Sequence, residues 1–99
     1  MSASSAPAPR APQIPIDKRA LVAVDLGAES CRVSLLRWRP DGEQATPEIT
    51  LVHRFPNGPV EDDGLRWPLA TIEAGIDEGL RRAAELAPEG IRSIAVDGW

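Results

Sequence analysis

The stretch that decides the fold is Ala20-Leu21-Val22-Ala23-Val24-Asp25-Leu26-Gly27-Ala28-Glu29-Ser30-Cys31-Arg32-Val33. An unbroken apolar run that ends in an aspartate is typical of a central strand covered on both faces. Gly27 to Ser30 predict a tight turn, and a second strand is predicted over 31–38. The first strand therefore delivers the Asp25 carboxylate to the edge of a glycine-containing turn.

The remaining elements are predicted by turn residues and by the spacing of apolar side chains. Pro40-Asp41-Gly42 predicts a turn before a third strand over 48–55, and the short connections favour an antiparallel meander. A loop over 56–67 leads into a helix between Pro68 and Pro88. Its predicted apolar face consists of Leu69, Ile72, Ile76, Leu80, Ala83 and Leu86.

Two further features of this helix are predicted by residue spacing. Asp77 with Arg81, and Glu78 with Arg82, are four residues apart and can form ion pairs on the exposed face. Gly75 and Gly79 weaken a helix, so we expect them to mark a close approach of the helix to the sheet.

The predicted fold class is α/β, with β-β-β-α-β order and a mixed sheet. A last strand over 91–97 follows the helix, and a crossover of this kind places it parallel to the first strand. The chain ends just after that strand, so we expect residues 20–99 to be the first, truncated part of a larger domain. Residues 1–19 are rich in Ala, Pro and Ser, and we expect a disordered tail.

Composition argues against nucleic acid and membranes as partners and indicates a cellular compartment. The 99 residues carry a formal net charge of -4, which argues against nucleic acid as a partner. No apolar run approaches the ~20 residues of a membrane span, and the amino terminus lacks a secretory signal, so no membrane is expected. One cysteine is compatible with the reducing cytoplasm, which is the expected location.

The corner between the first two strands suits a metal-bound polyphosphate. Asp25 can hold Mg²⁺, and Gly27 lets backbone N–H groups approach phosphate oxygens. Ser30 can donate a hydrogen bond, and the forked Arg32 guanidinium matches phosphate. The plainer alternative is a β-hairpin with an aspartate cap and a solvated arginine. The segment is neither a Walker loop nor a Gly-x-Gly-x-x-Gly motif.

Four stretches carry a resemblance to a known family: residues 22–33, His53-Arg54-Phe55-Pro56-Asn57-Gly58, Trp67 at the start of the helix, and Ser93-Ile94-Ala95-Val96-Asp97-Gly98-Trp99. Together they resemble the amino terminus of FGGY-type carbohydrate kinases, and among these the rhamnulokinases most. The resemblance covers residues 20–99. It implies a partial ribonuclease-H-like domain, the fold of sugar kinases, Hsp70 and actin.

The resemblance also implies an activity and a set of site residues. Such kinases transfer the γ-phosphoryl group of MgATP to a sugar, here to the 1-hydroxyl of L-rhamnulose. The cofactors would be ATP and Mg²⁺, with Asp25 at the metal and Asp97 and Trp99 at the sugar. The segment that binds the nucleotide phosphates would comprise Gly27, Ala28, Glu29, Ser30, Cys31 and Arg32.

The family's catalytic base lies later in the chain, so these 99 residues are expected to be inactive without the remainder of the kinase. Two positions, Gly98 and Glu29, depart from the family pattern. Rhamnulokinases commonly have Ser or Thr where this chain has Gly98, and small residues are usual at Glu29 and Cys31. At the larger Glu29 a contact with phosphate is therefore expected through the backbone and not through the side chain.

Alternatives remain open at this level. The sugar could be xylulose, ribulose, fuculose or glycerol, and the chain could instead be an actin-like or Hsp70-like nucleotide switch or a small module that binds no nucleotide. For single residues the ordinary interpretation comes first. His53 and Cys31 are expected to be structural, and Glu61-Asp62-Asp63 a solvated acidic loop. Asn57-Gly58 is expected to be a turn, with a place in the lining of the sugar pocket as the alternative.

Overall fold

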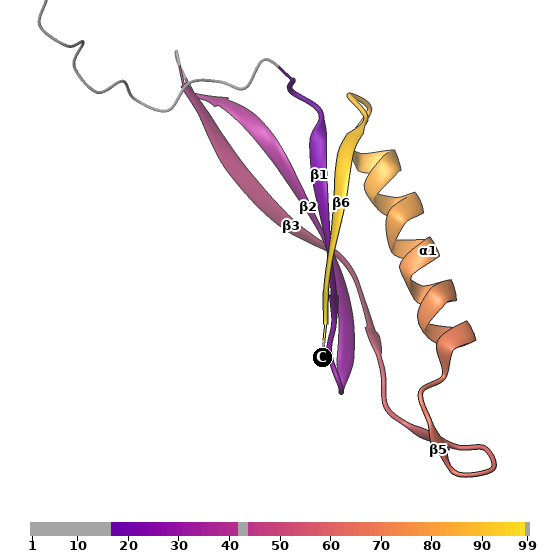
Figure 1. Cartoon of the computed structure of the whole chain (residues 1–99). Helices are drawn as coiled ribbons and strands as arrows, with labels where there is room; N and C mark the ends of the chain where they lie inside the picture. Colours follow the sequence, from indigo (N-terminus) through magenta and orange to yellow (C-terminus); the bar gives the residue numbers. More distant parts are fainter. Residues whose placement is uncertain (1–16, 42–43, 99) are drawn as a thin grey trace, which may run out of the picture.

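The structure is a computed structural model that describes residues 17–41 and 44–98 (Figure 1). Its elements are β1 (Ala20–Leu26), β2 (Ser30–Asp41), β3 (Gln44–Pro56), β4 (Val60–Glu61), β5 (Leu65–Arg66), α1 (Leu69–Leu86) and β6 (Ile91–Gly98). The predicted order of three strands, a helix and a strand is confirmed, and the short hairpin β4–β5 lies in the expected loop. Positions 1–16 of the expected tail, and Trp99, lie outside the described residues.

Four strands form one mixed sheet in the order β3-β2-β1-β6. β1 runs antiparallel to β2, and β2 runs antiparallel to β3. β6 lies on the other side of β1 and runs parallel to it, as the helical crossover predicted. The chain is therefore a small α/β domain with a mixed four-stranded sheet and one helix among its described residues.

The hairpin formed by β2 and β3 is longer than predicted and extends past the end of β1 (Figure 1). Its ladder continues to the pair Asp41–Gln44, so Pro40 and Asp41 lie in β2. The turn prediction is therefore wrong for Pro40 and Asp41, and Gly42, its third residue, lies outside the described residues. Cross-strand pairing in the exposed part of the hairpin, including an ion pair between Arg39 and Glu48, outweighs the local turn preference.

The helix α1 covers one face of the sheet, and the core lies between them (Figure 1). Ile72 and Ala83 of the predicted apolar face are buried, whereas Leu69 and Leu86 at the two ends of the helix are exposed. Both predicted helical ion pairs are present. Among the described residues, no helix combines the length and the apolar character needed to cross a membrane. The buried core cluster consists of Ala20, Val22, Val24, Val33, Leu35, Ala83 and Ala87.

The two helical glycines lie where α1 touches the sheet, which confirms the predicted close approach. A Cβ atom at Gly79 would lie 2.4 Å from Val33 Cγ2, and one at Gly75 would lie 2.5 Å from Phe55 Cζ. Both distances are too short for real carbon contacts. The absence of a side chain at these two positions therefore sets the distance between the helix and the sheet.

The opposite face of the sheet carries no covering element among the described residues. The side chains of Ala23 and Asp25 on β1 are exposed on this face, and Ile49 on β3 is 70% exposed. The apolar run of β1 is typical of a strand covered on both faces, but among the described residues the helix packs on one side only. We call this uncovered surface the open face.

Replacing Gly79 with Ala is expected to destabilise the protein, although alanine favours a helix by about 1 kcal/mol. Overpacking against Val33 costs roughly 1–3 kcal/mol and outweighs that gain. Urea unfolding should show a lower midpoint for Gly79→Ala than for the wild type. Glu73→Ala, on the exposed face of the same helix, should leave the midpoint nearly unchanged. Equal stability of Gly79→Ala and the wild type would contradict the close packing.

Candidate functional site

Four charged side chains form a row across the open face. Asp25 on β1 is paired with Arg32 on β2 and with Asp97 on β6, and Arg32 is paired with Arg54 on β3. Directly paired residues point to the same side of a sheet, so the four lie side by side in the order Asp97, Asp25, Arg32, Arg54. This charged row crosses the carboxyl ends of β1 and β6, the edge at which α/β sheets bind their ligands.

The charged row has an acidic half and a basic half. Arg32 Nη1 donates a hydrogen bond to Asp25 Oδ2 at 3.3 Å, and these side chains are 42% and 55% exposed. An exposed pair of this kind contributes only ~0–1 kcal/mol, so a ligand can replace it at little cost. Within the described part of the chain, Asp97 and Arg54 form no ion pair. The row therefore offers two adjacent carboxylates next to two adjacent guanidinium groups.

A bulge in the β2–β3 ladder determines which side chain of β3 joins the row. The pairing shifts by one residue between Val33 and Ser34. The shift turns His53 toward α1, where its Nδ1 lies 3.1 Å from Arg82 Nη1 and its ring stacks on Phe55. Arg54 consequently lies opposite Arg32. Sequence analysis gave Arg54 no role, because the position of a bulge is not visible in the residue pattern.

In the turn between β1 and β2, the backbone of Gly27 approaches the backbone of Ser30 too closely for a side chain at Gly27. The Gly27 N–H donates to the Ser30 carbonyl at 3.1 Å, and a Cβ at Gly27 would lie 2.3 Å from that oxygen. The Gly27 N–H is thus used inside the turn. In the described structure the N–H groups of Ala28 and Glu29 donate to no backbone carbonyl, and both residues are exposed. These two groups are available to an anion at the turn.

Ser30 and Cys31, which precede Arg32 in the predicted phosphate-binding segment, are both buried. Ser30 is 8% exposed, and the Cys31 side chain is fully buried beside its strand partner Phe55, on the side of α1. Burial raises the pKa of the Cys31 thiol. A ligand on the open face could therefore meet Cys31 only through its backbone, and the thiol has no role as a nucleophile there.

Asn57, expected from the sequence in a turn or at the sugar pocket, lies against the turn between β1 and β2. Its side-chain Nδ2 donates to the Gly27 carbonyl at 2.9 Å, so it touches the turn directly. The His53–Gly58 stretch was noted as a family likeness, but nothing in it indicates that Asn57 contacts this turn. Only the pairing of Ser30 with Pro56, the neighbour of Asn57, reveals that the end of β3 lies beside the turn.

The donor set fits a magnesium ion bound together with a polyphosphate. Mg²⁺ takes one or two protein carboxylates and completes its shell with water and phosphate oxygens. Asp25 and Asp97, on adjacent parallel strands, supply two. No cluster of three or more His, Cys, Asp or Glu suited to a metal occurs within residues 17–41 and 44–98.

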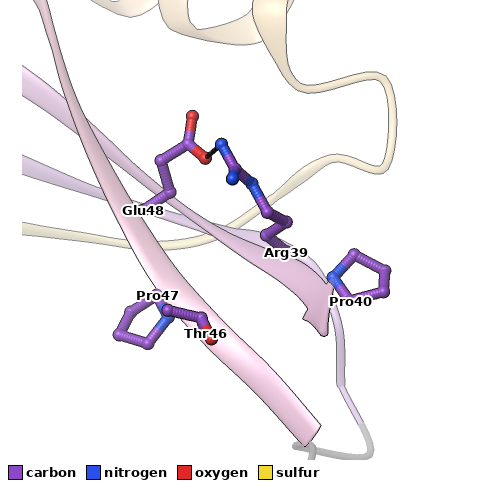
Figure 2. Close-up of a pocket in the computed structure, with 5 residues that line it drawn as sticks. All are labelled: Arg39, Pro40, Thr46, Pro47 and Glu48. Atoms are coloured by element: carbon purple, nitrogen blue, oxygen red, sulfur yellow. Dashed lines mark ion pairs between the residues drawn. The ribbon is translucent and has the colours of Figure 1, made fainter. Parts of the chain in front are cut away.

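Figure 2 shows a separate open hollow at the far end of the β2–β3 hairpin. It is lined by Arg39, Pro40, Thr46, Pro47 and Glu48, and Arg39 is paired with Glu48 across it. Arg39 and Arg32 are seven residues apart on β2, about 23 Å along an extended strand. The hollow therefore lies too far away to belong to the charged row, and its two charged groups already satisfy each other.

No protein-family model matches the chain.

The buried position of Cys31 has a measurable chemical consequence. A buried thiol with a raised pKa holds less reactive thiolate, so the folded protein should react with DTNB at pH 8 at least about tenfold more slowly than the protein in denaturant. The release of thionitrobenzoate measures both rates at this one position. Equally fast labelling in both states would contradict the placement of Cys31 beneath α1.

Proposed function

We propose that this chain forms the nucleotide-binding part of an ATP-dependent sugar kinase of the FGGY type. In its most specific form the proposal is a rhamnulokinase, which transfers the γ-phosphoryl group of MgATP to the 1-hydroxyl of L-rhamnulose. The observation that carries it is the charged row, with two carboxylates and two guanidinium groups beside a turn that has unused N–H groups.

Each half of the charged row has a distinct task in phosphoryl transfer. Arg32 and Arg54 would bind and orient the nucleotide phosphates and offset the charge that develops on their oxygens. The N–H groups of Ala28 and Glu29 would bind a second set of phosphate oxygens. Asp25 and Asp97 would hold Mg²⁺, which supplies neutralising charge when it is bound with the nucleotide. Such positioning is most of what phosphoryl transfer requires from a protein.

The element order supports the ribonuclease-H-like form of the fold. Three antiparallel strands, a helical crossover and a fourth strand parallel to the first match the beginning of the domain shared by sugar kinases, Hsp70 and actin. A mixed four-stranded sheet with one helix also occurs in other α/β domains, so the order alone does not identify the family. The likeness of residues 22–33 and 53–58 to rhamnulokinases adds the sequence argument.

The sugar side of the proposal rests on the end of β6. Asp97 lies there with an exposed side chain, directly beside Asp25. Its place in the charged row is compatible with the sugar contact that the resemblance implies as well as with a contact to the metal. Trp99, the second residue proposed for the sugar, lies outside the described residues. L-rhamnulose is chosen by likeness, and xylulose, ribulose, fuculose and glycerol are the other sugars to be compared.

The direct test uses the full-length protein and one pair of matched variants. We expect tight, magnesium-dependent ATP binding and transfer of phosphate to L-rhamnulose in preference to the other sugars. Arg32→Ala should lower kcat/KM for ATP by about 10²–10³, because a donor to developing charge is lost. Arg39→Ala removes the same side chain from the far end of β2 and should leave kcat/KM nearly unchanged. Coupled ADP release measures both variants.

Three results of this test would argue against the proposal in different ways. Absence of ATP binding in the presence of magnesium would favour a module that binds no nucleotide. ATP hydrolysis without transfer to any sugar, with assembly seen by sedimentation, would favour a nucleotide switch. Equal activity of Arg32→Ala and Arg39→Ala would remove the charged row from the mechanism.

A further inference from the structure

We infer that Asn57 is a positioning residue, which holds the turn between β1 and β2 in the shape that binds nucleotide phosphates. The inference rests on the proposed function, because it assigns a task to the turn as a phosphate-binding segment. It goes further in naming a side chain outside the turn that determines how the turn presents its N–H groups. Asn57 is the only asparagine in the chain and directly follows β3.

Asn57 makes two hydrogen bonds to the turn. Its side-chain Nδ2 donates to the Gly27 carbonyl at 2.9 Å. Its main-chain N–H donates to the Glu29 carbonyl, also at 2.9 Å. One residue at the end of β3 therefore holds two carbonyl groups of the turn, one on each side of Ala28.

These bonds orient the N–H groups on the other side of the same peptide units. A trans peptide is planar, so the carbonyl of one residue and the N–H of the next point in opposite directions. With the Gly27 carbonyl held by Asn57, the Ala28 N–H points away from Asn57. In the described structure it donates to no backbone carbonyl, and Ala28 is exposed. Asn57 thus presents this N–H to a ligand.

The side-chain bond also replaces part of the usual hairpin pairing. Residues that flank a two-residue hairpin loop commonly exchange two backbone hydrogen bonds. Here Gly27 donates to Ser30, but among the described backbone hydrogen bonds none returns from the Ser30 N–H to the Gly27 carbonyl. The Asn57 amide binds that carbonyl instead. The turn is therefore open on one side, and its shape depends on a residue from another strand.

The unpaired oxygen of the same amide supports this role. Asn57 Oδ1 is buried and accepts no hydrogen bond from the described residues. Reversing the amide would place this oxygen against the Gly27 carbonyl oxygen, so the donor must stay where it is. The amide keeps its bond to Gly27 and leaves its buried Oδ1 without a donor, which costs free energy of folding. A residue that served only to stabilise the fold locally would not be expected to carry this cost. Asn57→Asp is the sharpest variant, because it keeps the shape and removes the donor.

The experiment compares Asn57→Asp and Asn57→Ser with the wild type in the full-length protein. The dissociation constant for MgATP should rise about tenfold or more in both variants, as expected for one lost hydrogen bond in a binding site. The KM for L-rhamnulose should change less than about twofold, whereas a general loss of structure would raise both. The backbone amide resonance of Ala28 should shift. Thr46→Ala, at the other end of β3, should change none of the three.

The outcomes separate this inference from the proposed function. If the wild type binds MgATP and both variants bind it equally well, the role of Asn57 is overturned and the kinase proposal stands. If the wild type binds no MgATP, the kinase proposal fails, and the nucleotide-binding role of Asn57 fails with it. The Ala28 resonance then shows whether Asn57 still orders the turn. If Asn57→Asp does not fold, Asn57→Ser decides by the same measurements.

Discussion

The position of β1 between two partners is the constraint on which the rest of the molecule depends. This strand is hydrogen-bonded to β2 on one side and to β6 on the other, in opposite senses. Its register therefore fixes three things at once: which side chains face α1, which face outward, and which charges become neighbours. Asp25 lies between Arg32 and Asp97 for this reason, although Asp97 is far from the other two in sequence. Slipping the register by one residue would move Asp25 to the side of α1.

The sequence predicted those parts of the fold that depend on local patterns. The apolar run of β1, the helical spacing of α1 and its two ion pairs were all predicted, because each follows from residues close together in the chain. Pro40 and Asp41 were expected in a turn because they resemble turn residues, but cross-strand pairing holds them in β2. Covering of both faces was also expected, and the described chain covers only one.

The candidate site could be predicted only in part, and the reason is again the distance between the residues in sequence. The first strand and its turn are continuous, so Asp25, Gly27 and Arg32 could be named from the pattern. Arg54 and Asn57 reach the same corner through the register of β3, and a one-residue bulge decides that Arg54 rather than His53 faces outward. No periodicity marks a bulge of this kind before the pairing of the strands is known.

The hydrogen bonds of the turn are made mainly by its backbone, so its side chains can differ from those of the carbohydrate kinases that it resembles. Glu29 is larger than the residues usual there in those kinases and is negative, yet the turn uses its carbonyl oxygen, which accepts from Asn57, and leaves its side chain exposed. Cys31 is buried away from the open face. Local geometry also explains how a chain of net charge -4 could bind an anion, because Arg32, Arg54 and the unused N–H groups meet at one corner of the sheet. Attraction of an anion therefore requires only this corner to be positive, whatever the net charge of the chain. The carboxylates in the acidic half of the same row suit the Mg²⁺ ion that would accompany the anion.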